Sequence, residues 1–154
     1  MSLVVLLAIA TLAQDPETAA VGAAIDRMHA AASEADGPAY FARFTADARF
    51  IGTDATEHWP LSQFRAYADP YFARGQGWTY VPRDRVVTIA PIECRCVAWF
   101  DEKLTNTAYG DLRGSGVLRL TADGWQIEQY VLSFTVPNDR SRAVVEAIRG
   151  SDHP

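Results

Sequence analysis

Residues 107–136 read TAYGDLRGSGVLRLTADGWQIEQYVLSFTV. Apolar and polar side chains alternate on both sides of Asp123-Gly124, a dipeptide that favours a two-residue hairpin turn. The pattern therefore predicts two antiparallel strands, at 107–121 and 125–136. Strands of this length must twist and curl, and Gly110, Gly114 and Gly116 are places where the first of them can bend.

The chain between Trp78 and this hairpin has the same period of two. Two more strands, rich in Val, Ile, Thr and Trp, are expected at 78–90 and 93–104, with Pro91 in the turn between them. A shorter strand is expected at 49–52. Together these segments predict consecutive antiparallel hairpins.

Before Trp78 most apolar residues follow helical spacing. Asp15-Pro16-Glu17 begins a first helix, with an N-cap, a proline in the first turn and an acid at the positive end. A short second helix follows Asp36, Pro60 opens a third that Pro70 kinks or ends, and residues 140–149 can form a terminal helix. Helices followed by hairpins predict an α+β fold, in which three helices pack on one strongly curved antiparallel sheet.

The 154 residues fit a single domain, which we place at 15–150. An apolar run at 3–13 is too short to span a bilayer, but it has the length of a signal-peptide core, although no Lys or Arg precedes it. We therefore expect residues 1–14 to be a cleaved signal, which gives a periplasmic or secreted protein with no stable membrane insertion after processing. The alternative is an apolar arm, packed on the domain or on a neighbouring copy, in a cytoplasmic protein.

The charge and the metal-binding residue types exclude several classes of function. A net charge of −5 argues against nucleic-acid partners. His29, His58 and His153 are far apart, so no metal site is expected. Cys94 and Cys96 share a face if they lie on a strand, and a bridge between such near neighbours would be strained, so we expect two small thiols.

Several strings resemble one known family. They are Tyr40-Phe41, Phe50-Ile51-Gly52-Thr53-Asp54, Ala98-Trp99-Phe100-Asp101-Glu102, Arg113-Gly114-Ser115-Gly116-Val117-Leu118 and Gly124-Trp125. In this order they are similar to the SnoaL-like branch of the nuclear transport factor 2-like superfamily. The resemblance implies a cone-shaped fold, a pocket between helices and sheet, and often a homodimer. It implies no single activity, because the superfamily includes isomerases, cyclases, dehydratases and binding domains.

Strand parity suggests which side chains line such a pocket. Asp101 and Trp99 share a face, and a carboxylate beside an indole on a concave apolar wall suits a general base. Two other interpretations stay open: Phe100, Glu102 and Leu104 face inward instead, or Asp101 pairs with Arg113. By the same parity argument the other expected lining residues of the strands are Tyr109, Arg113, Gln129 and Ser133.

The loop before the third helix and that helix itself supply the remaining candidates. Trp59 is either a pocket wall or an ordinary core anchor. Asp54 is either a second catalytic acid or a helix cap. Tyr67 belongs to the aromatic residues that suit an apolar ligand.

Three hypotheses about function follow. The first is a domain that binds a small apolar or carbonyl-containing molecule. The second is an acid–base enzyme of the isomerase, cyclase or dehydratase type, in which Asp101 or Asp54 moves a proton; neither hypothesis requires a cofactor. The third is a structural or interaction domain whose pocket is filled. Because the strands are apolar on both faces, we also expect a homodimer through the outer face of the sheet.

Overall fold

The computed structural model describes residues 15–150. Its elements, in chain order, are α1 (Pro16–Ser33), α2 (Gly37–Phe41), β1 (Phe44–Ile51), β2 (His58–Pro60), α3 (Leu61–Phe72), β3 (Val81–Ile89), β4 (Val97–Asn106), β5 (Gly110–Thr121), β6 (Gly124–Phe134), a 3-10 turn (Asn138–Arg140) and α4 (Ser141–Gly150). The apolar run expected to be a signal lies outside the described residues, and the homodimer and the export both stay predictions. None of the helices within 15–150 is long and apolar enough to cross a membrane.

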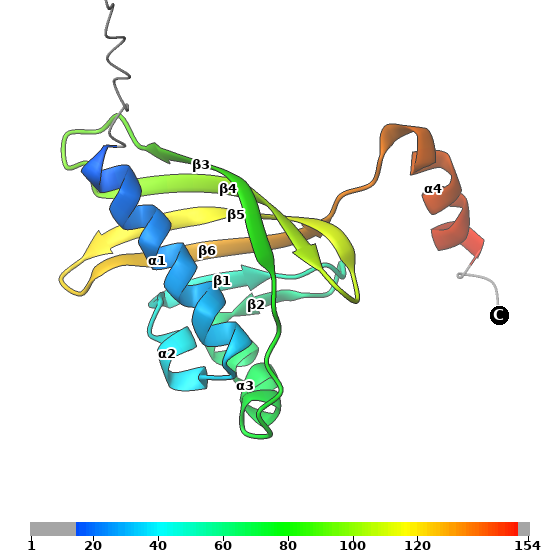
Figure 1. Cartoon of the computed structure of the whole chain (residues 1–154), viewed down its shortest axis with the longest axis horizontal. Coiled ribbons are helices and arrows are strands. Elements are labelled where there is room, and N and C mark those ends of the chain that lie inside the picture. Colours follow the sequence, from blue (N-terminus) through cyan, green and yellow to red (C-terminus); the bar gives the residue numbers. More distant parts are fainter. Residues whose placement is uncertain (1–14, 151–154) are drawn as a thin grey trace, which may run out of the picture.

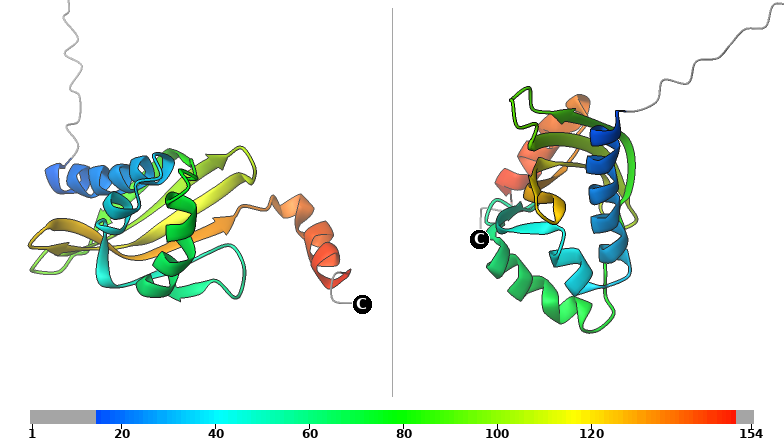
Figure 2. Two further views of the ribbon diagram at one scale, coloured as in Figure 1. Left: turned by 90° about the horizontal axis from the view of Figure 1, so that it is seen from below. Right: turned by 90° about the vertical axis from the view of Figure 1, so that its left-hand side faces the viewer.

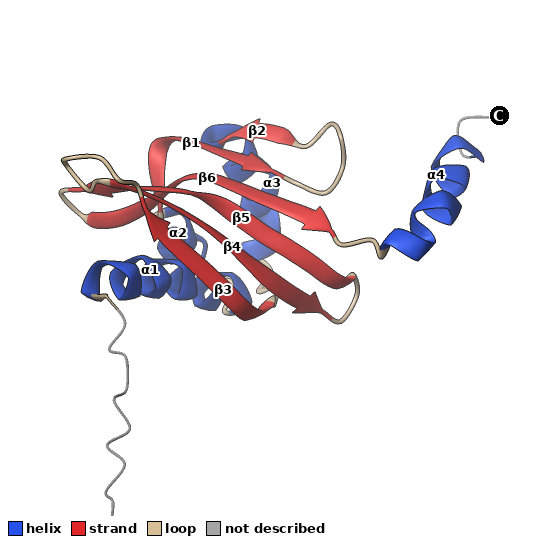
Figure 3. Cartoon of the chain, turned by 90° about the horizontal axis from the view of Figure 1, so that it is seen from above, coloured by secondary structure: helices blue, strands red, loops and turns tan. Residues whose placement is uncertain are grey.

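The six strands form one curved sheet in the order β2-β1-β6-β5-β4-β3. Helices α1, α2 and α3 lie on one face of it, while α4 projects away from the end of β6 (Figure 1, Figure 2). The α+β class with helices on a curved sheet is thus confirmed. The sheet is not wholly antiparallel, because β1 runs parallel to β6 (Figure 3).

Helix α1 begins where the capping residues predict. The carboxylate of Asp15 accepts a hydrogen bond from the backbone N–H of Thr18 at 3.4 Å, and Pro16 occupies the first turn. The apolar stripe of Val21, Ile25 and Met28 is buried against the sheet. This packing fixes the inner face of α1, which also carries His29.

The inward set of strand β4 is the opposite of the one expected. Ala98, Phe100, Glu102 and Leu104 are buried, whereas Trp99 and Asp101 are exposed on the outer face. The expected parity is therefore wrong for this strand, and the alternative with Glu102 inside holds. The physical reason is that His29 and Arg85 pair with the Glu102 carboxylate inside the fold. Because its charge is compensated there, Glu102 can occupy an inward position between apolar residues of β4.

The same reversal moves the other polar candidates to the outer face. Strand β5 buries Leu112 and Leu118, so Arg113 points outward. In β6 the pairing with β5 shifts between Val117 and Leu118, which leaves Glu128 as an extra residue in the ladder. Beyond this bulge Tyr130 and Leu132 face inward, and Gln129 and Ser133 do not.

Cys94 and Cys96 form a disulfide, so the expectation of two thiols is wrong. They lie in the 91–96 turn between β3 and β4, not on a strand. Arg95 between them has φ of +46°, and the two Cα atoms are 5.1 Å apart. In an extended strand the same two atoms would be roughly 6.6 Å apart, and their side chains would stand parallel.

Candidate functional site

A cavity of about 230 Å³ opens between the helices and the concave face of the sheet. Ten aromatic residues line it: Tyr40, Phe50, Trp59, Phe64, Tyr67, Tyr71, Trp78, Tyr80, Tyr109 and Tyr130. The charged or titratable lining residues other than these tyrosines are His29 and Glu57. The cavity is thus lined by rings, and its polar side chains are those of the six tyrosines, His29, Thr53, Glu57 and Gln76.

Stacked rings from three elements build the floor of the cavity. Phe64 of α3 lies 3.9 Å from Phe50 of β1, centroid to centroid, with an interplanar angle of 11°. Trp59 of β2 stacks on Phe64 at 5.7 Å and contacts Tyr67 at 4.9 Å. Because Phe64 is 2% exposed while Tyr67 is 48% exposed, the stack leads from the core to the mouth of the cavity. Trp59 is therefore both a cavity wall and an anchor of the core.

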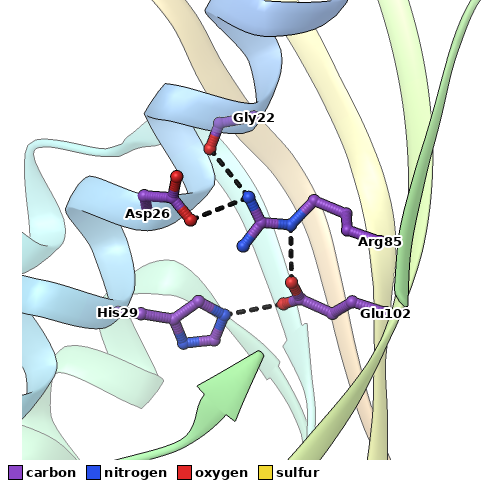
Figure 4. A network of polar contacts seen from close by, with 5 residues as sticks. All are labelled: Gly22, Asp26, His29, Arg85 and Glu102. Carbon is purple, nitrogen blue, oxygen red and sulfur yellow. Dashed lines mark hydrogen bonds and ion pairs between the residues drawn. The ribbon is translucent and has the colours of Figure 1, made fainter. Parts of the chain in front are cut away.

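The inner end of the cavity carries a buried polar network (Figure 4). His29 Nε2 lies 2.6 Å from Glu102 Oε1, and Arg85 Nε donates to Glu102 Oε2, also at 2.6 Å. Arg85 Nη1 donates to the carbonyl of Gly22 and pairs with Asp26. Helix α1 and strands β3 and β4 thus meet at one carboxylate that is fully buried.

Electrostatics explain how this network tolerates burial. Burial by itself would lower the pKa of Arg85, but Glu102 and Asp26 together hold that pKa above its ordinary value. Its Nη2 atom is buried and has no hydrogen-bond partner within the described chain. Because Glu102 is held by Arg85 on one oxygen, its other oxygen is free to accept from His29 Nε2–H. In the neutral imidazole, that arrangement places the lone pair on Nδ1.

Tyr130 lies close to this network. Burial, followed by the nearby charge of Glu102, raises the pKa of its hydroxyl well above the ordinary value. Gly114, opposite Glu102 in the sheet, provides the space, since a Cβ there would come within 2.6 Å of the Tyr130 hydroxyl and 3.2 Å of Glu102. Gly114, expected as a place where the strand bends, therefore also leaves room for the Tyr130 hydroxyl and the Glu102 carboxylate.

Of the candidates expected from the sequence, Trp59, Tyr67 and Tyr109 line the cavity. Trp99, Asp101, Arg113, Gln129 and Ser133 are not among its lining residues. Asp54 is not either; its carboxylate accepts from the hydroxyl and amide of Thr56, which lowers its pKa. It caps the 54–56 turn and not α3, whose N-cap Pro60 has no side-chain bond.

Sequence reasoning missed His29 and Glu102 as a pair. The signal was present in β4, where Glu102 interrupts an apolar set of alternate residues and faces a glycine of the next strand. A charged residue in such a position needs a buried partner. Among the described residues no group of three His, Cys, Asp or Glu could hold a metal ion.

Comparisons with known proteins agree with this architecture. Residues 21–137 match the SnoaL-like domain model. A domain of unknown function with a cystatin-like fold from Nostoc punctiforme is 19% identical, with a TM-score of 0.69 over 86% of each chain. An NTF2-like protein of unknown function from Pseudomonas putida is 14% identical, with a TM-score of 0.63 over 79% of this chain and 89% of that one.

A ketosteroid isomerase-like protein from Erwinia carotovora atroseptica has 24% identity and a TM-score of 0.58, over 80% of this chain and 100% of that one. No curated protein matches the chain. At such identities the solved structures establish the fold alone. Because the domain model covers most of the chain, the protein belongs to the family of SnoaL-like domains.

Proposed function

We propose that this domain binds a small, largely apolar molecule in the ring-lined cavity. The observation that carries the proposal is the cavity of about 230 Å³ whose walls are ten aromatic side chains and whose inner end holds His29. Walls of aromatic side chains that also carry polar groups are typical of small-molecule sites. A hydroxyl or carbonyl of the ligand would meet His29 and the hydroxyl of Tyr130.

Blocking the mouth of the cavity should abolish this binding. Thr53 is an exposed lining residue, so Thr53→Trp fills the entrance without touching the core. We expect saturable one-site binding of a neutral aromatic compound such as indole or 2-naphthol by calorimetry, and at least a tenfold loss of affinity in this variant, which corresponds to about 1.4 kcal/mol.

Thr79→Trp is the matched control, because Thr79 is exposed and does not line the cavity. An equal loss of affinity in both variants would refute the proposal. So would the absence of binding of indole and 2-naphthol by the unmodified protein.

A second function, proton transfer, is favoured by the contact between His29 and Glu102. A carboxylate that orients an imidazole on a cavity wall is the arrangement of a general base. The glutamate would hold Nε2–H and stabilise the imidazolium, while Nδ1 takes a proton from carbon next to a ligand carbonyl. The base is then His29, in place of Asp101 or Asp54.

This function can be tested without knowing the substrate. Enolisable ketones such as 2-tetralone, incubated with the protein in D₂O, should gain deuterium next to the carbonyl. His29→Gln should slow that exchange by roughly 10²–10⁴-fold. His58→Gln, at the exposed first position of β2, is the control and should exchange at the full rate. Exchange that is unaffected by His29→Gln would rule out this role and leave the binding function in place.

A further inference from the structure

The charges around the cavity are unevenly distributed. No Arg or Lys is among the lining residues, and the carboxylate in the lining is that of Glu57. At the inner end, Arg85 faces two carboxylates, Asp26 and Glu102, so its positive charge is fully countered. An anionic ligand would therefore find no permanently charged cation to pair with, whereas a cationic ligand would find Glu57.

Glu57 has no cationic partner within residues 15–150. One of its oxygens, Oε2, accepts a hydrogen bond from the backbone N–H of Asp54 at 3.2 Å, and this bond holds the side chain in place. Gly52 leaves room for the carboxylate, because a Cβ at that position would collide with Oε2. The carboxylate is thus positioned by the loop and not neutralised by it.

Three aromatic rings share the cavity lining with Glu57. Tyr67 and Tyr109 are 48% and 56% exposed although both line the cavity, and Trp59 contacts Tyr67. Aromatic faces attract cations, and quaternary ammonium groups are recognised by such sets of rings. The neighbouring Tyr71 already makes this kind of contact within the protein, with the guanidinium of Arg74 at 5.1 Å from its ring centroid.

We propose that the cavity selects a ligand with an organic ammonium group on an apolar body, with the ammonium beside Glu57 and the rings of Trp59, Tyr67 and Tyr109. This inference rests on the proposed binding function and adds the charge of the ligand to it. The field of Glu57 also reaches into the cavity: burial, Tyr109 and then Glu57 raise the pKa of Tyr80 to about 12. A negative potential that opposes phenolate formation also favours a bound cation.

Three probes of similar size and different charge test the inference. They are phenyltrimethylammonium, its neutral isostere tert-butylbenzene, and benzoate, titrated by calorimetry in phosphate buffer. We expect phenyltrimethylammonium to bind about tenfold more tightly than tert-butylbenzene, from one or two cation–π contacts and the carboxylate. Benzoate should bind more weakly than either.

Two variants test whether the Glu57 carboxylate causes the preference for the cationic probe. Glu57→Gln should bring the ratio of the first two affinities close to one while leaving tert-butylbenzene binding unchanged. Gly52→Ala should lower the same ratio by displacing the carboxylate without removing it. Glu93→Gln, which removes the same charge from the exposed 91–96 turn, should leave the ratio unchanged.

The outcomes separate the two proposals. Equal affinity for the cation and its neutral isostere, tighter binding of benzoate, or a ratio unchanged in Glu57→Gln would overturn the charge inference. If none of the three probes binds while indole or 2-naphthol does, the charge inference fails and the binding function stands. If nothing binds in either experiment, both fail.

Discussion

Replacing Glu102 with Ala is expected to lower the free energy of unfolding by about 3–5 kcal/mol. The carboxylate is fully buried, and its loss leaves the guanidinium of Arg85 and the ring of His29 without their shared partner. Arg85 Nη2 already lacks a partner, so the loss would add Nε as a second unsatisfied donor of the same guanidinium. Urea denaturation followed by far-ultraviolet circular dichroism measures the change.

Glu128→Ala is the matched control. Glu128 lies on β6 and also accepts two interactions, from Arg119 at 3.0 Å and from the hydroxyl of Thr45 at 3.0 Å, but its side chain is 33% exposed. We expect its removal to cost no more than about 1 kcal/mol. If both variants lose the same stability, the buried network is not a principal support of the fold.

Phe64→Ala is expected to cost about 3–5 kcal/mol, the range for removing a buried aromatic ring. Phe64 is 2% exposed and stacks with both Phe50 and Trp59. The ring also forms part of the cavity wall, so the variant should enlarge the cavity. Thermal denaturation gives the stability, and titration with 2-naphthol reports the change in affinity.

Phe134→Ala separates the effect of burial from that of the residue type. Phe134 is 48% exposed at the end of β6, and its ring contacts Tyr109 edge-on. Its replacement is expected to change stability by no more than about 0.5 kcal/mol. A Phe64 variant as stable as this one would mean that the stack at the floor of the cavity contributes little.

Apart from β2, which lies where a loop was expected, the order of elements could be predicted from the sequence because most of them have a local cause. Asp15 and Pro16 begin α1, Pro60 precedes α3, and Asp123-Gly124 turns β5 into β6. The parallel pairing of β1 with β6 has no such cause. It depends on contacts between residues about 80 positions apart, such as Phe50 and Tyr130. No turn sequence next to either strand predicts such a pairing.

The site was harder to predict because it depends on which way side chains point. Trp59, Tyr67 and Tyr109 lie in a short edge strand, a helix and a turn, where their position in the cavity does not rest on strand parity. Asp101 and Arg113 lie within strands, where an error of one residue reverses the face. Glu102 faces inward because His29 and Arg85 pair with it, and these contacts join residues that are distant in the sequence.

The extra residue at Glu128 has a consequence for how the chain can change in length. Deleting it in frame would restore strict alternation between Ile127, Gln129 and Tyr130, and every inward side chain of β6 would keep its face. Deleting Val131 would instead turn Leu132 away from the cavity. Insertions and deletions that survive selection in this strand should therefore gather at 128, and a gap placed elsewhere in an alignment of β6 would misassign the cavity wall.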